Sequence, residues 1–222
     1  MEHFDMELDA LKQKLLAMAG HAENAVNRAI EALTTRNYEL AVRVKDDDEI
    51  IDRFEIEVDE LAIQLLAKAP LASDLRFVTV AMKISQNLER VGDEASKIAK
   101  RARDLTKEPP LKINLELPRM CALALAHLKG ALDAFVNRDS AAARALVPRD
   151  KEVDLLNKHI NQALTEHMIA NRDSIPRCLN LMVVSRSLER IADHAKNVAE
   201  EVVFLCEAQD IRHTAKTHAK NT

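Results

Sequence analysis

The sequence contains an internal repeat about one hundred residues long, and this repeat limits the folds open to the chain. The segments "NLERVGDEAS" (87–96) and "SLERIADHAK" (187–196) share Leu-Glu-Arg, a branched apolar residue, a small residue and Asp at an offset of 100. Further upstream, Ala32 corresponds to Ala134 at an offset of 102. Each copy is far longer than a solenoid repeat, so the pattern predicts two similar domains in tandem.

The composition favours an all-α fold for both copies. The 222 residues include only 3 glycines and 6 prolines, and aromatic residues make up 3%. Ala, Leu, Glu, Lys and Arg dominate, as they do in long helices. With 47% hydrophobic residues, a chain of this length can bury a substantial core.

Helix-breaking residues divide each copy into three segments, which predicts two tandem three-helix bundles built from six long helices. The breaks fall at Asn37, Pro70, Pro109-Pro110, Arg138-Asp139, 171–176 and near Gln209. Two adjacent prolines cannot continue a helix, so they mark the link between the copies. The expected organisation is a first bundle at 1–108, a linker at 109–118, a second bundle at 119–210 and a frayed tail at 211–222.

Charge and motif content exclude several classes of function. The formal net charge is −4 with both signs interspersed, so we expect no nucleic-acid binding. Apolar runs such as 181–185 fall well short of the ~20 residues that a membrane span needs. The three cysteines form no C-x-x-C pair, which fits a reducing cytoplasm. Neither a glycine-rich phosphate loop nor a nucleophile motif is present, so we expect no enzyme activity and name no catalytic residue.

Eight carboxylates occupy matched places beside the predicted apolar stripes. The middle and last helix of each copy both carry two acidic residues four positions apart, on one side of the helix. In an antiparallel hairpin, residues equally distant from the turn lie opposite each other. The midpoint between the two acidic pairs falls at Pro70 in one copy and beside Asn171 in the other. The two pairs of each copy therefore lie opposite each other, ~30 Å from the turn. The sequence therefore predicts two patches: a first patch of Asp48, Asp52, Glu89 and Asp93, and a second patch of Asp150, Asp154, Glu189 and Asp193.

Four carboxylates held together repel one another, so a compensating cation is expected at each patch. The chain itself offers Arg90, Lys97, Arg190 and Lys196. The alternative is a metal ion, and an all-oxygen site favours iron(III), manganese, magnesium or calcium over zinc held by thiolate or imidazole. These faces lack the Glu-x-x-His of a ferritin-like di-iron centre. A solvated acidic helix face is the competing interpretation.

The chain resembles the PhoU family of bacterial phosphate-signalling proteins over nearly its whole length. The resemblance rests on "MAGHAENAVNRAIEAL" (18–33), "DDDEIIDRFEIEVDE" (46–60), "ASDLRFVTVAMKISQNLERVGDEASKIAK" (72–100), "RDKEVD" (149–154) and "IPRCLNLMVVSRSLERIADHAKNVAE" (175–200). It implies two three-helix bundles whose E/D-x-x-x-D motifs hold multinuclear metal clusters, with iron first and manganese, magnesium or zinc as the other candidates. Those motifs fall on the same eight residues. Glu55 and Asp59 correspond to Asn157 and Asn161, so we expect the second patch to bind metal differently.

The resemblance also implies a function. A PhoU-like protein would be a cytoplasmic adaptor, not an enzyme, that negatively regulates the phosphate-starvation response by coupling a phosphate ABC transporter to a sensor histidine kinase. The implied partners are the ATPase subunit of the transporter, the kinase and a second copy in a homodimer, at the inner face of the membrane. Two other classes stay open: a metalloenzyme that activates water or dioxygen at the carboxylates, and a plain helical scaffold.

Overall fold

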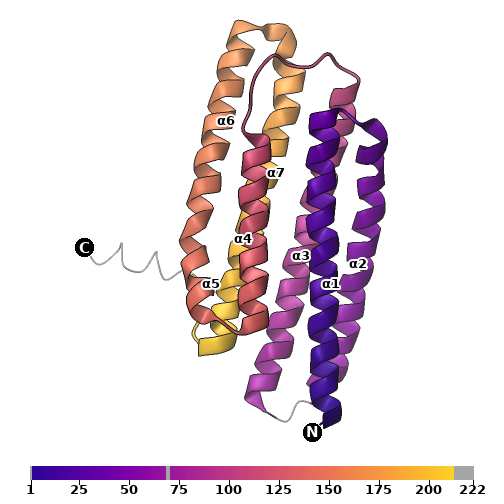
Figure 1. The fold of residues 1–222 in the computed structure, drawn as a ribbon, viewed down its shortest axis with the longest axis vertical. Helices are drawn as coiled ribbons and strands as arrows, with labels where there is room; N and C mark the ends of the chain where they lie inside the picture. Colours follow the sequence, from indigo (N-terminus) through magenta and orange to yellow (C-terminus); the bar gives the residue numbers. More distant parts are fainter. Residues whose placement is uncertain (1, 69–70, 213–222) are drawn as a thin grey trace, which may run out of the picture.

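The computed structural model describes residues 2–68 and 71–212, and this part of the chain consists of helices joined by short loops (Figure 1). The first half forms α1 (Glu2–Thr35), α2 (Tyr38–Leu66) and α3 (Ala72–Thr106). The second half forms α4 (Leu117–Asn137), α5 (Ser140–Leu146), α6 (Asp150–Ala170) and α7 (Ile175–Glu207), with 3₁₀ turns at Val147–Arg149 and Arg172–Ser174. The predicted all-α fold of two related three-helix bundles is confirmed.

The middle segment of the second bundle is interrupted, where the sequence pattern predicts one continuous helix. The 3₁₀ turn at Val147–Arg149 separates α5 from α6. Pro148 lies inside this turn, and its ring nitrogen cannot donate the backbone hydrogen bond that an α-helix needs. Together α5, the turn and α6 correspond to α2 of the first bundle.

The turn after the first helix is repeated in both bundles down to backbone conformation. Arg36 and Arg138 follow α1 and α4 with left-handed φ angles of 55° and 51°. The next residues, Asn37 and Asp139, begin the following helices, and their side-chain oxygens accept a backbone N–H three residues on at 3.0 and 2.9 Å. This duplication of turn geometry supports the sequence repeat. The turn expected at Pro70 lies outside the described residues.

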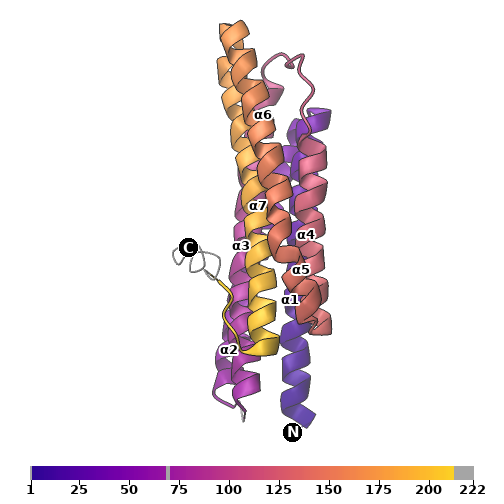
Figure 2. The same cartoon turned by 90° about the vertical axis from the view of Figure 1, so that its left-hand side faces the viewer.

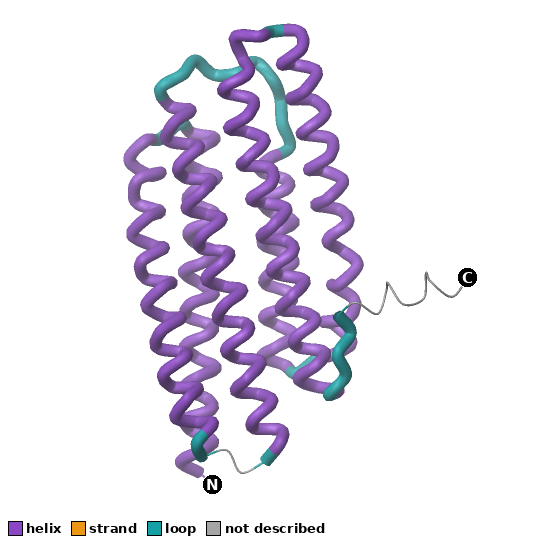
Figure 3. Tube along the Cα trace, turned by 180° about the vertical axis from the view of Figure 1, so that it is seen from behind, coloured by secondary structure: helices purple, strands orange, loops and turns teal. Residues whose placement is uncertain are grey.

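The two bundles are joined at one end by the segment 107–116, which follows α3 without regular structure (Figure 3). Side chains of both bundles hold this segment. Arg36 donates to the carbonyl oxygen of Glu108, and Arg177 of α7 donates to that of Pro109 at 2.9 Å.

The chain after α7 also contacts the bundle before the described part ends. Ile211 packs against the core, and Arg212 lies 3.2 Å from Glu201. The rest of the tail expected to fray, 213–222, lies outside the described residues.

The bundles pack side by side through α3 and α7, which run antiparallel at the centre of the molecule (Figures 1 and 2). Lys83 of α3 lies 3.0 Å from Glu201, and Glu94 of α3 lies 3.2 Å from Arg190. One hydrophobic cluster runs through both bundles, and the rings of Phe77 on α3 and Phe135 on α4 stack with centroids 5.6 Å apart. The halves therefore share a core.

Within residues 2–68 and 71–212, no helix is both long enough and apolar enough to cross a bilayer.

Candidate functional site: two carboxylate patches

The first patch lies where α2 and α3 approach closely, and a glycine allows this approach. A Cβ added to Gly92 would lie 2.9 Å from Cδ1 of Ile51 and 3.3 Å from Oδ1 of Asp48, both on α2. The carboxylate of Asp48 therefore rests against the backbone of α3 beside Asp93.

The pKa shifts in the first patch show that its carboxylates lie close enough to repel one another. Burial raises the pKa of Asp48, the nearby hydroxyl of Ser96 lowers it, and the charges of Asp52 and Asp93 raise it. Burial likewise raises the pKa of Glu89, with added repulsion from Asp93 and Asp52. The structure thus brings all four predicted residues of this patch together.

Two further carboxylates, Glu55 and Asp59 of α2, extend the first patch. Burial raises the pKa of Glu55, followed by repulsion from Asp59 and Asp52. In the sequence, this pair stands out only as a difference between the halves. The spacing of 48, 52, 55 and 59 on one helical face is the signal that places them beside the predicted residues.

Arg90 supplies a positive charge to the first patch. Its Nε lies 3.2 Å from Oε2 of Glu89, and its Nη1 lies 3.2 Å from Oδ2 of Asp93. The guanidinium is 54% exposed, so these contacts are weak. Among the described residues, Arg90 is one positive charge beside several carboxylates, so the first patch keeps a net negative charge.

The second patch has a cation built into it. Nζ of Lys196 lies 2.5 Å from Oδ2 of Asp150, whose side chain is 9% exposed, and this hydrogen bond raises the pKa of Lys196. Burial raises the pKa of Asp193, and the charges of Asp154 and Glu189 add to the effect while Lys196 opposes it. All four predicted carboxylates of the second patch therefore lie together, with an ammonium group among them.

The amides that replace Glu55 and Asp59 in the second bundle form hydrogen bonds within that bundle. Oδ1 of Asn157 accepts hydrogen bonds from Ser185 Oγ and Asn161 Nδ2, both at 2.7 Å. Asn157 is buried, so this network stabilises the contact between α6 and α7 and adds no charge to the patch.

Two of the four cations expected to neutralise the patches contact another residue. Nζ of Lys97 and Nη1 of Arg190 lie 2.9 and 3.2 Å from Oε1 of Glu94, a buried carboxylate at the contact between α3 and α7. Arg190 of α7 therefore links the two bundles through Glu94, Lys97 pairs with Glu94 within α3, and Arg90 and Lys196 contact the patches.

The donor chemistry of the two patches differs with respect to a metal ion. Within the described part of the chain, no three His, Cys, Asp or Glu side chains form a preformed metal-binding group. The first patch offers carboxylate oxygens that repel one another, a donor set that suits hard cations. In the second patch an ammonium group already occupies the most buried carboxylate, so the first patch is the better fit.

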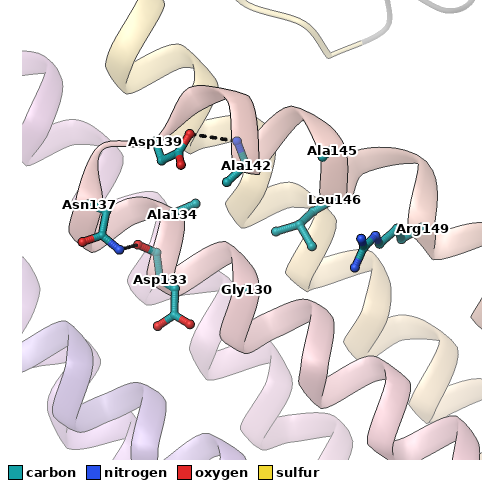
Figure 4. Close-up of a pocket in the computed structure, with 9 residues that line it drawn as sticks. All are labelled: Gly130, Asp133, Ala134, Asn137, Asp139, Ala142, Ala145, Leu146 and Arg149. Carbon is teal, nitrogen blue, oxygen red and sulfur yellow. Dashed lines mark hydrogen bonds between the residues drawn. The ribbon is translucent and has the colours of Figure 1, made fainter.

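A separate pocket of about 340 Å³ lies between α4 and α5 and contains neither patch (Figure 4). It is bounded by Gly130, Leu146 and small residues, with Arg149 at one end. One of its two carboxylates, Asp139, accepts the N–H of Ala142 as the helix cap and so has a structural role.

Comparison with known proteins supports the fold of two related bundles. A family model described as "PhoU domain" matches residues 15–102 and 117–202, one match in each bundle. The chain is 38% identical over 221 residues to the phosphate-specific transport system accessory protein PhoU homolog of Pseudomonas aeruginosa, covering 99% of this chain and 91% of that protein. It is 33% identical to the PhoU of Escherichia coli K12, covering 95% and 88%.

Solved structures show the same architecture. The crystal structure of PhoU from Pseudomonas aeruginosa superposes with a TM-score of 0.89 at 38% identity, covering 93% of this chain and 100% of the other. The phosphate transport system regulatory protein PhoU from Streptococcus pneumoniae gives a TM-score of 0.87 at 27% identity, covering 94% and 99%.

Proposed function

The chain belongs to the PhoU family, and on that premise we propose that it is an accessory adaptor that represses the phosphate-starvation response. The observation that carries this proposal is similarity along almost the whole chain to proteins named as accessory to phosphate-specific transport. A long pair of bundles offers several helical faces to partners, which suits an adaptor.

The proposed partners are the ATPase subunit of a phosphate ABC transporter and a phosphate-sensing histidine kinase. The adaptor would act in the cytoplasm at the inner face of the membrane, as a homodimer. Affinity capture of the full-length protein from cells grown with and without phosphate should recover transporter and kinase subunits. Recovery of neither partner under both conditions would contradict this assignment.

Deletion of the gene tests repression directly. Expression of phosphate-starvation genes should rise in phosphate-rich cells that lack the protein and return to normal when the gene is restored. Unchanged expression would refute the proposed role.

We further propose that the first patch binds a hard metal ion, with iron ahead of manganese, magnesium and zinc. Asp48, Asp52, Glu89 and Asp93 would hold it through their carboxylate oxygens, and its charge would relieve their repulsion. The residues of the second patch, with Lys196 on Asp150, would hold metal more weakly.

Paired variants test metal binding and its location. The double substitution Glu89→Gln with Asp93→Asn should lower the metal content of protein reconstituted with iron or manganese. Glu189→Gln with Asp193→Asn makes the same change in the second patch and should lower it much less. Equal losses of metal from the two double variants would show that the patches bind metal equally. If the wild type holds no metal tightly, the protein is a metal-free scaffold. Turnover of phosphoesters or dioxygen by the loaded protein would favour a metalloenzyme.

A further inference from the structure

A second polar pocket lies between α2 and α3, next to the first patch but on the other side of Asp48. Its volume is about 380 Å³, within the usual range for small-ligand pockets. Ala41, Val42 and Ala99 form its apolar part, and Ser96 and Asp48 close it toward the patch. Three cationic residues complete the lining: Lys45, Lys100 and Arg103.

The cations of this pocket are held only loosely by acidic neighbours. Lys45 lies 3.7 Å from Glu49, and Arg103 lies 3.8 Å from Asp104, both at the outer limit for an ion pair. The Lys45 side chain is 79% exposed, and such contacts contribute little. The lining of the pocket therefore holds three positive groups and one carboxylate, that of Asp48.

The internal repeat shows that this arrangement belongs to the first bundle alone. Lys45, Ser96, Lys100 and Arg103 correspond to Val147, Lys196, Glu200 and Val203. In the second bundle the positive charge lies inside, on Lys196 against Asp150. In the first bundle the smaller Ser96 leaves open the space that Lys196 fills in the second. The positive charges of the first bundle lie around this open space.

We propose that this pocket binds a compact phosphate group, either inorganic phosphate or the phosphate of a small phosphorylated molecule. A guanidinium and two ammonium groups match the several oxygens of a tetrahedral oxyanion. The hydroxyl of Ser96 can donate a further hydrogen bond. The carboxylate of Asp48 favours phosphate over sulfate, because a protonated phosphate oxygen can donate to it and a sulfate ion has no proton to donate.

The pocket shares Asp48 with the proposed metal site but does not depend on the adaptor role, and phosphate binding can be tested in metal-free protein. Isothermal titration calorimetry of the full chain, with a chelator present, should show saturable binding of one phosphate per chain that weakens with salt. Sulfate at the same concentration should bind at least about tenfold more weakly. Pyrophosphate serves as the probe for a phosphorylated molecule, and whichever of the two phosphate compounds binds more tightly identifies the source.

Variants locate the site. Lys100→Glu with Arg103→Val gives the pocket the residues of the second bundle and should weaken phosphate binding at least about tenfold. Lys158→Glu with Arg186→Val makes the same change of charge on exposed positions of the second bundle, and binding should persist. If the first variant does not fold, as judged by circular dichroism, Ser96→Lys fills the pocket with an ammonium group and should abolish binding.

Three outcomes would overturn the proposal. One is the absence of saturable binding of either phosphate or pyrophosphate to the wild type. Another is equal binding of sulfate, which would remove the role of Asp48 and with it the assignment to phosphate. The third is an equal effect of the two double variants, which would indicate general attraction to surface charge.

Discussion

Lys196 Nζ lies 2.5 Å from Asp150 Oδ2 in the second bundle, whereas Ser96 stands at the equivalent place in the first. Together with the change from Glu55 and Asp59 to Asn157 and Asn161, this difference makes the two patches electrically unlike. It gives one bundle an internal counter-ion and leaves the other with an excess of carboxylates.

Replacing Lys196 should therefore destabilise the second bundle and alter its chemistry. Lys196→Ser leaves the buried carboxylate of Asp150 without its partner, so the free energy of unfolding should fall by about 1–3 kcal/mol at pH 7 in metal-free protein. Urea denaturation measures this loss, and Lys151→Ser at an exposed position should change little. Metal added to the variant should restore more stability than metal added to the wild type. An equal response of both proteins would argue against Lys196 as a substitute cation.

Neutralising Glu89 should stabilise the metal-free protein. Burial and the charge of Asp93 hold the pKa of Glu89 above its ordinary value of 4.5, against the opposing charge of Arg90. A carboxyl group with a raised pKa in the folded state costs stability while it is ionised, and this cost disappears as pH falls through the raised pKa toward 4.5. Glu89→Gln should therefore raise the free energy of unfolding by roughly 0.5 kcal/mol at pH 7.

The pH dependence supplies the check on that prediction. The difference between Glu89→Gln and the wild type should vanish below pH 4.5, where the carboxyl group is neutral in both folded and unfolded chains. Denaturation in the presence of a chelator at several pH values measures it, with Glu23→Gln on the exposed face of α1 as the control. A difference that stays constant with pH would rule out a charge effect.

Glu94 should behave in the opposite way, because its charge is stabilised. Burial alone raises the pKa of Glu94, but hydrogen bonds with Lys97, Ser187 and Arg190 outweigh this effect and hold it below 4.5. The side chain is 4% exposed, so Glu94→Ala should lower the free energy of unfolding by about 2–3 kcal/mol at pH 7.

The loss from Glu94→Ala should shrink with acid. A lowered pKa stabilises the fold above the unfolded value of 4.5, and this contribution disappears as pH falls through the folded pKa. Urea denaturation of Glu94→Ala and Glu94→Gln between pH 7 and acid measures both effects. The Gln variant keeps a hydrogen-bonding group and should lose less. If Ala and Gln cost the same at every pH, the contacts with Lys97 and Arg190 contribute nothing specific.

Gly92→Ala tests the close approach of α2 and α3. The added Cβ would lie 2.9 Å from Cδ1 of Ile51, so the packed Ile51 side chain must shift, although alanine gains up to about 1 kcal/mol of helix propensity. We expect a net loss of about 1 kcal/mol in the free energy of unfolding. Ile51→Val removes that Cδ1 and should cost less in the Gly92→Ala protein than in the wild type, a coupling that a double-mutant cycle measures. Additive effects would place the strain elsewhere.

The sequence repeat and helical phase predict the bundles and the pairing of carboxylates across each hairpin, because both depend on period and distance from a turn. The structure accordingly brings Asp48 next to Asp93. The break at Pro148 was not predicted, since the apolar pattern continues through it. The contact of Arg190 with Glu94 also could not be predicted, because it depends on how the two bundles pack, and helical phase describes one helix at a time.

The antiparallel contact between α3 and α7 has a consequence for how this fold depends on concentration. Asn87 meets Asn197 and Glu94 meets Arg190, so Gly92 and its counterpart Ala192 lie at the same height on the two helices. Two separate half-chains would meet through the same face by a half-turn rotation, and their stability would depend on protein concentration. The segment 107–116 makes that encounter intramolecular. The joined chain therefore keeps its shared core at any dilution, because the tether fixes the effective concentration of one half around the other.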